Sequence, residues 1–91
     1  FSETRQLHAM VIALAQVKKY EEAARVMDRV LAQEQNPDAN ICMNAGILYF
    51  QVGRLDDSKL WLSKCKAAQD NPAKIIDDYL GWIAEREQGK W

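Results

Sequence analysis

The chain contains little of what builds tight turns, metal sites or nucleophilic centres. Its 91 residues include four glycines, two prolines, two cysteines and one histidine. So few glycines and prolines favour helices over a turn-rich β fold. With His8 alone, neither a His-based metal pair nor a Ser-His-Asp arrangement is possible. Cys42 and Cys65 form no C-x-x-C pair, so we expect two buried thiols.

No charge of one sign dominates, and no apolar run is long. Twelve basic and thirteen acidic residues give a formal net charge of −1, which provides no general attraction to nucleic acid or to an acidic membrane surface. No apolar run approaches the roughly 20 residues that span a bilayer. We therefore expect no nucleic-acid partner and no membrane insertion. The absence of a disulfide framework favours a reducing, cytoplasmic compartment.

Sites for catalysis or cofactors are also missing from the sequence. There is no glycine-rich phosphate loop. The adjacent acids Asp56-Asp57 and Asp77-Asp78 point about 100° apart on a helix, so neither pair would face a single substrate. We expect capping and solvation to account for both pairs. The sequence therefore predicts no enzymatic activity, no metal and no cofactor.

What the chain does contain is helical periodicity. Its length favours one domain, and we expect five helices. The first starts after Ser2 and the second covers 20–34, with Lys18-Lys19 as the turn between them. The third covers 38–52 and ends at Gly53, the fourth is capped by Asp56, and the fifth covers 73–87. Asn36-Pro37 and Asn71-Pro72 stop the second and fourth helices, because a residue before proline avoids the helical conformation.

Apolar residues at helical spacing predict the inner faces. The inner residues expected in the first four helices are Leu7, Met10, Val11, Leu14 and Val17; Ala23, Val26, Met27, Val30 and Leu31; Ile41, Cys42, Ala45, Leu48, Tyr49 and Val52; and Leu55, Leu62 and Cys65, with Trp61 beside them.

The second and fourth helices share one sequence pattern. Residues 20–31 read YEEAARVMDRVL, and residues 55–66, thirty-five places on, read LDDSKLWLSKCK. Gln16-Val17 recurs as Gln51-Val52 at the same period, and Met27 aligns with Leu62. A fixed period in this range is typical of stacked helical hairpins, in which neighbouring units cover each other's apolar faces.

The repeat resembles the tetratricopeptide family. Ala45-Gly46-Ile47-Leu48-Tyr49 is similar to its L-G-x2-Y motif, and Tyr20-Glu21-Glu22-Ala23 to the start of its second helix. Leu80-Gly81 is similar to the L-G of a third unit that lacks its second helix. Met10-Val11 and Cys42 depart from the family's L-G and Trp. The resemblance implies one all-α domain over 1–91, with repeats at 4–37 and 39–72 and a closing helix at 73–87.

In this family the first helix of each hairpin lines a concave, partner-binding groove. The resemblance implies that the groove contains His8, Ile12, Gln16, Asn40, Met43, Asn44, Ile47, Phe50, Gln51 and Trp82. Several of these are apolar, and an exposed apolar patch marks an interaction site. The expected partner is an apolar or amphipathic segment of another protein, with a chaperone or secretion-complex adaptor as one form.

Two alternatives stand beside this interpretation, and one known ligand of the family is rejected. The fifth helix could fill the groove, which would make these residues plain core. The chain could instead self-associate, or be a structural segment that stacks on further repeats of a larger tetratricopeptide protein. A further family ligand is the acidic tail of heat-shock chaperones, held by a clamp of Lys, Asn and Arg residues. Only Asn44 matches that clamp, whose other positions carry His8, Ile12, Ile75 and Tyr79, so the cationic part is missing.

Overall fold

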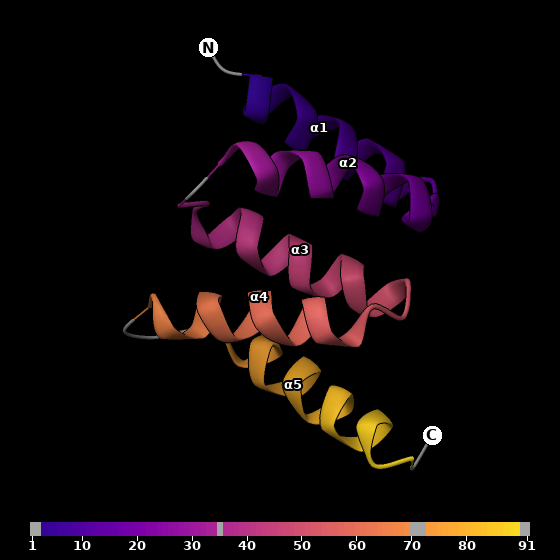
Figure 1. Cartoon of the computed structure of the whole chain (residues 1–91), viewed down its shortest axis with the longest axis vertical. Helices are drawn as coiled ribbons and strands as arrows, with labels where there is room; N and C mark the ends of the chain where they lie inside the picture. The colour runs from indigo at the N-terminus through magenta and orange to yellow at the C-terminus, as the bar shows by residue number, and fades with distance from the viewer. Residues whose placement is uncertain (1–2, 35, 70–72, 90–91) are drawn as a thin grey trace.

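The helices pack in the order in which they occur along the chain (Figure 1). The structure is a computed structural model that describes residues 3–34, 36–69 and 73–89. Its five helices are α1 (Glu3–Gln16), α2 (Tyr20–Gln33), α3 (Ala39–Gln51), α4 (Leu55–Ala67) and α5 (Lys74–Glu87), and the described residues contain no strand. α1 pairs with α2 and α3 with α4 as antiparallel hairpins, and α5 packs on α4 and α3. The predicted all-α fold of stacked hairpins is confirmed.

The turns of the two hairpins are copies of each other at the thirty-five-residue period. The Lys19 amide donates to the Leu14 carbonyl at 2.9 Å, and the Arg54 amide donates to the Tyr49 carbonyl at 2.8 Å. Lys18 and Gly53 both have positive φ, of 63° and 80°. One left-handed residue after a helix lets the next amides satisfy its last carbonyls. The period in the sequence is therefore also a period in backbone structure.

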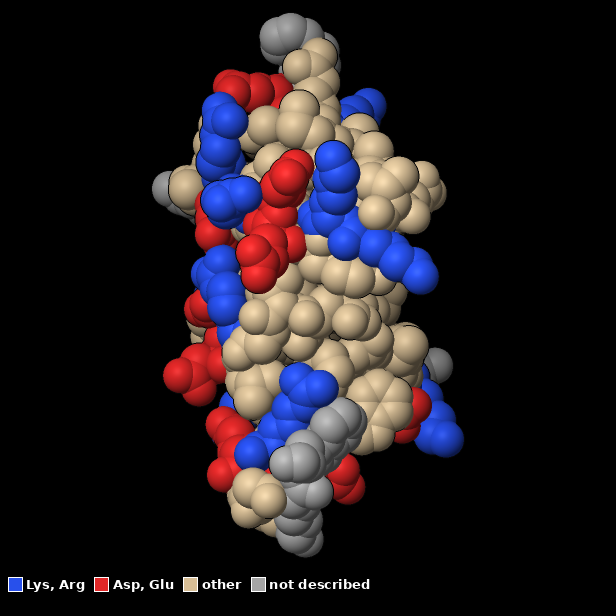
Figure 2. All heavy atoms as spheres, turned by 90° about the vertical axis from the view of Figure 1, so that its right-hand side faces the viewer, with Lys and Arg blue, Asp and Glu red and all other residues tan. Residues whose placement is uncertain are grey.

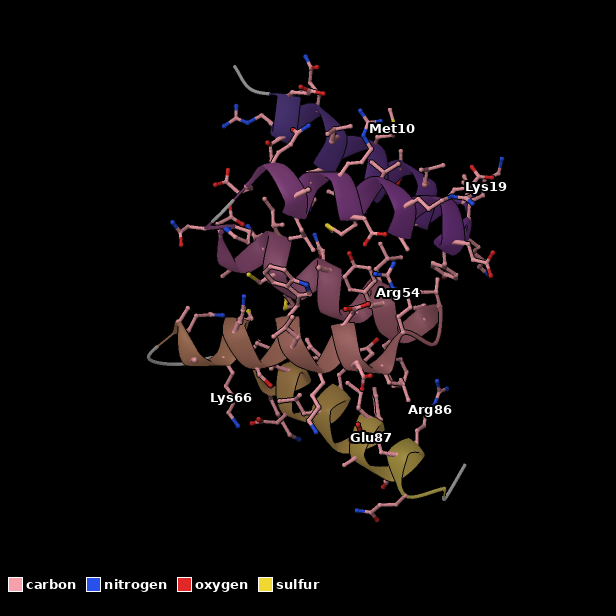
Figure 3. All side chains as sticks on the ribbon, in the orientation of Figure 1. Met10, Lys19, Arg54, Lys66, Arg86 and Glu87 are labelled. Atoms are coloured by element: carbon pink, nitrogen blue, oxygen red, sulfur yellow. The ribbon has the colours of Figure 1, made fainter. Side chains whose placement is uncertain are left out.

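The core forms two connected clusters, one among α1, α2 and α3 and the other among α3, α4 and α5. Most of the expected inner residues are buried or half-buried. Met10 and Val17 are the exceptions, at 50% and 64% exposed. Met10 lies on the side of α1 that faces away from the stack (Figure 3), and Val17 directly follows the last residue of α1. Leu7 and Val11 turn toward α2 and α3 instead.

α3 and α4 approach each other closely at Gly46. A Cβ atom added to Gly46 would lie 2.4 Å from Leu62 Cγ. On the same side, Ser58 Oγ donates a 2.6 Å hydrogen bond to the Gly46 carbonyl. Ser58 and Leu62 are fully buried, so their positions are constrained. The contact explains why a glycine stands in the middle of a helix, where it otherwise costs about 0.5–1 kcal/mol relative to alanine.

Helix ends differ from the expectations in small ways. Asp38 caps α3 by accepting a 2.9 Å hydrogen bond from the Ile41 amide. The prediction that Asp56 caps α4 is wrong, because that helix begins at Leu55 and no side chain caps it. Several other ends lie one residue inside the predicted ranges. The expected signals at Ser2 and Asn71-Pro72 lie outside the described residues.

A polar network joins the two hairpins on the side away from α1. Arg54 donates to Asp28 on α2 at 2.9 Å and to Asp57 on α4 at 2.9 Å. Its guanidinium carbon also lies 4.4 Å from the centre of the Tyr49 ring, and Figure 3 shows Arg54 between these helices. The network therefore fixes how the second hairpin sits against the first.

The longest dimension of the molecule is 42 Å, along the direction in which the helices stack. α1 and α5 form its two ends (Figure 1). Within the described part of the chain, no helix has the length and apolar character needed to cross a bilayer.

Candidate partner-binding groove

A hollow of about 430 Å³ lies between α1 and α3. Five of the ten predicted groove residues line it: Ile12, Gln16, Asn44, Ile47 and Gln51. The lining is completed by Val11, Ala15, Tyr20 and Leu48. Residues three or four apart share one face of a helix. Ile12 and Gln16 on α1, and Asn44, Ile47 and Gln51 on α3, therefore face the same space.

The floor of the hollow is apolar and its rim is polar but uncharged. Val11 and Leu48 are buried beneath it, whereas Ile12 is 41% exposed and Ile47 is half-buried. The side-chain amides come from Gln16, Asn44 and Gln51. None of the described residues that line the hollow is an acid or a base. The surface can therefore cover apolar side chains and offer hydrogen bonds, but it provides no charge for binding a carboxylate.

His8 and Asn44 bridge α1 and α3 beside the hollow. Asn44 Nδ2 lies 3.1 Å from His8 Nε2. Because an amide nitrogen only donates, the imidazole accepts through Nε2. His8 is half-buried and belongs to the predicted groove. The contact that it makes is structural, because it joins α1 to α3, which are the first helices of the two hairpins.

Phe50 does not have the exposure expected of a groove residue. It is 8% exposed, because α5 covers it. Tyr79 packs against Phe50 in a T-shaped arrangement with ring centroids 5.1 Å apart, and the guanidinium carbon of Arg86 lies 4.5 Å from the centre of the Phe50 ring. The prediction that Phe50 offers a free apolar surface is therefore wrong. The alternative in which the fifth helix fills part of the groove is correct at this position.

Of the remaining predicted residues, Met43 and Trp82 lie beside this α5 contact. Met43 is half-buried against the cluster that contains Phe50. Asn40 is exposed in the first turn of α3. Trp82 is 40% exposed, although its ring packs against Tyr79 with centroids 5.0 Å apart. Trp82 and the exposed Ile75 therefore add apolar surface on α5, separate from the residues that line the hollow.

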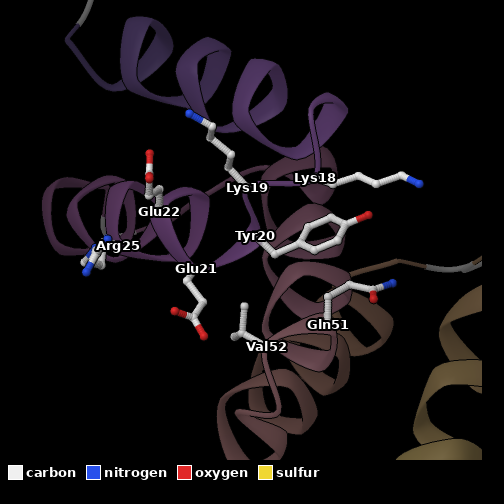
Figure 4. Close-up of a pocket in the computed structure, with 8 residues that line it drawn as sticks. All are labelled: Lys18, Lys19, Tyr20, Glu21, Glu22, Arg25, Gln51 and Val52. Atoms are coloured by element: carbon white, nitrogen blue, oxygen red, sulfur yellow. The ribbon is translucent and has the colours of Figure 1, made fainter.

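A second hollow, of about 420 Å³, lies next to the first at the turn between α1 and α2 (Figure 4). Its rim carries three bases and two acids: Lys18, Lys19, Arg25, Glu21 and Glu22. Figure 2 shows such side chains of both signs side by side on this end of the molecule. Tyr20 and Gln51 line both hollows. The uncharged groove therefore opens at one end onto a rim of mixed charge.

The resemblance implies that Ala15 also faces the groove, but sequence reasoning misses the other three lining residues, Val11, Tyr20 and Leu48. Apolar spacing assigns Val11 and Leu48 to the core, and both are indeed buried, so they form the floor of the hollow. Tyr20 is expected only as the start of the second helix. Its position four residues after Gln16, across a tight turn, is the signal that places it near the groove.

The cysteines have the environment predicted for buried thiols. Both are free and buried. Burial raises the pKa of the Cys42 thiol, and it also raises the pKa of the Cys65 thiol. Such thiols are poor nucleophiles at neutral pH. Among the residues that the structure describes, no group of three His, Cys, Asp or Glu side chains is placed to hold a metal ion.

No known protein-family profile, curated protein or solved structure matches the chain. Its function is therefore inferred from the geometry of the groove and from the repeat.

Proposed function

We propose that this chain is a protein-interaction module of the tetratricopeptide type, which binds an apolar or amphipathic segment of a partner protein in the groove between α1 and α3. The observation that carries the proposal is the hollow beside Ile12 and Ile47, which has an apolar floor and an uncharged amide rim. The repeated hairpin turns and the close contact at Gly46 support the family resemblance.

The shape of the hollow limits what the partner offers. Its volume of about 430 Å³ accepts one or two large apolar side chains rather than a whole ligand surface. Covering such a side chain is worth about 1.5–3 kcal/mol before the costs of association. The amides of Gln16, Asn44 and Gln51 each donate and accept, so they suit the polar side of a helix or the backbone of an extended segment. The finer role of chaperone or secretion adaptor follows if that segment is aggregation-prone when free.

Selection from a library of displayed random peptides tests the proposal. The library would be selected on the 91-residue protein, and the recovered peptides would be measured against Ile12→Asp and Ile47→Asp. Leu60→Asp is the matched control, because Leu60 is 47% exposed on α4, away from the groove. The proposal predicts amphipathic peptides that lose at least about tenfold in affinity for the two groove variants and none for the control. Peptides that bind all three variants equally would refute it.

A further inference from the structure

The first hairpin turn has a lysine where its copy in the second hairpin has a glycine. Lys18 and Gly53 are separated by one thirty-five-residue period, and their φ angles are 63° and 80°. Among the described residues, Lys18 is the only residue other than glycine with a positive φ. A side chain in this conformation costs free energy that glycine avoids. Because residues held in such conformations cluster at functional sites, Lys18 is a candidate for a binding role.

Lys18 lies at the end of the groove. It lines the second hollow together with Tyr20 and Gln51, and these two residues also line the groove between α1 and α3. Lys18 and Gln51 are exposed, and Tyr20 is half-buried. Figure 4 shows the side chains of all three extending to the same side of the turn. A segment bound in the groove would therefore meet these three polar ends as it leaves the groove.

The acids of the rim do not neutralise Lys18. Glu21 and Glu22 lie on the other side of the turn (Figure 4), and no ion pair joins either of them to Lys18. In the part of the chain that the structure describes, the side chains of Lys18, Tyr20 and Gln51 make no hydrogen bond and no ion pair. An ammonium, a phenol and an amide each donate hydrogen bonds. The end of the groove thus has three unused donors, one of which is positively charged.

We infer that the partner segment carries an acidic side chain close to its apolar anchor, and that Lys18 binds this carboxylate. The acid lies on the same side of the segment as the anchor, within about four residues, or one helical turn, of it. The Tyr20 hydroxyl and the Gln51 amide donate to the carboxylate beside the ammonium of Lys18. A carboxylate only accepts hydrogen bonds, and a bond from a charged donor is stronger than a neutral one.

This inference rests on the proposed function and adds the chemistry of the partner to it. The apolar anchor over Ile12 and Ile47 supplies most of the affinity, and the acid sets the direction in which the segment lies along the groove. A single lysine suits a single carboxylate. Glu21 and Glu22, on the other side of the turn, disfavour a polyanion such as nucleic acid.

Peptides selected on the 91-residue protein test the inference. The library is attached to its carrier through the peptide C termini, so an acid in a recovered sequence is a side chain and not a terminal carboxylate. The selected peptides should be enriched in Asp or Glu within four residues of the apolar anchor. Replacing that acid by its amide should weaken binding to wild type about three- to fivefold, as for an exposed ion pair. The same replacement should leave binding to Lys18→Gln unchanged, because the carboxylate has already lost its partner.

Lys19→Gln is the matched control for Lys18→Gln. It removes the same charge from the next residue, whose side chain extends to the other side of the turn (Figure 4). Titration calorimetry should give wild-type affinity for Lys19→Gln and a loss of about three- to fivefold for Lys18→Gln. Equal losses in the two variants would overturn the inference, because they indicate general attraction between opposite charges. Selected peptides without an enriched acid would also overturn it.

Lys18→Gly separates binding from folding. It should raise the denaturant midpoint, because glycine relieves the cost of the positive φ, and yet bind the acidic peptides about three- to fivefold more weakly. A variant that had lost its fold could not do both. Peptides that lose affinity for Ile12→Asp and Ile47→Asp but bind Lys18→Gln as tightly as wild type would overturn this inference and leave the proposed function intact. Peptides that bind all four variants as tightly as wild type would overturn both.

Discussion

The Tyr49 hydroxyl donates a 2.6 Å hydrogen bond to Asp28 Oδ1, which links α3 of the second hairpin to α2 of the first. Arg54 donates to the other oxygen of the same carboxylate at 2.9 Å. Partial burial raises the pKa of Asp28, but the hydrogen bonds from Arg54 and Tyr49 outweigh it and hold the pKa below its ordinary value. Burial and the neighbouring carboxylate raise the pKa of Tyr49. The pair therefore stabilises the stack while Asp28 is ionised and Tyr49 is protonated.

Asp28→Asn should make the free energy of unfolding less dependent on pH in the acid range. The pKa of Asp28 is lower in the folded than in the unfolded state, where it is about 3.9. Its contribution is therefore complete above that value and is lost as pH falls through the folded-state pKa. At neutral pH the variant should lose about 1 kcal/mol of unfolding free energy, a modest value because the Asp28 side chain is 43% exposed. Urea unfolding should show that this gap closes in acid, whereas a gap independent of pH would contradict the account. Asp78→Asn is the control.

Gly46→Ala and Gly81→Ala should change stability in opposite directions. The new Cβ at Gly46 would meet buried Leu62 at 2.4 Å, so repacking should cost about 1–3 kcal/mol. At Gly81 the Cβ meets nothing within 4 Å, and alanine should stabilise α5 by about 0.5–1 kcal/mol. Thermal unfolding of the two variants gives the comparison directly. Equal effects at the two glycines would show that α3 and α4 are not as close as described.

A second pair of substitutions tests the left-handed residues in the two hairpin turns. Lys18 adopts a φ of 63°, which costs a residue with a side chain about 1–2 kcal/mol. Glycine removes this cost from the folded state, but it also gives the unfolded chain more conformational freedom, which offsets part of the gain. Lys18→Gly should therefore stabilise the protein by about 0.5 kcal/mol. Gly53→Ala, at a φ of 80°, should destabilise by about 1 kcal/mol. The denaturant midpoints of the two variants are the measurement. If Lys18→Gly destabilised the protein and Gly53→Ala stabilised it, the two turns could not share this left-handed conformation.

Alanine substitutions at Phe50 and Ile12 should distinguish a core residue from a groove residue. Phe50→Ala removes a ring that is 8% exposed and packed against Tyr79 and Arg86, so it should cost about 3 kcal/mol. Ile12 is 41% exposed, and Ile12→Ala should change stability by less than about 0.5 kcal/mol. Calorimetric melting of both variants is the measurement. A Phe50→Ala variant as stable as wild type would mean that α5 does not cover this ring.

Local patterns predict the helices well, because their causes are local. Apolar spacing, the left-handed residue at Gly53 and the Asn36-Pro37 stop act within a few residues of the chain. The thirty-five-residue period also predicts burial, because equivalent positions such as Met27 and Leu62 are equally buried.

Exposure is harder to predict, because it depends on contacts between distant segments. Nothing near Phe50 in the sequence indicates that Tyr79 and Arg86 cover it. Met10 and Val17 are apolar at helical spacing, but both are exposed. Two predicted groove residues that do line the hollow, Ile12 and Ile47, lie where the first helices of the two hairpins meet. There the repeat itself determines which helices are neighbours.

Chemical-shift mapping with a selected peptide tests the central claim most directly. The isotope-labelled protein would be titrated with the tightest peptide from the library, and amide shifts would be followed residue by residue. Binding in the groove predicts the largest changes at Ile12, Gln16, Asn44, Ile47 and Gln51, with little change along α4. The largest changes on α2 and α4, with Ile12 and Ile47 unmoved, would contradict the proposed groove.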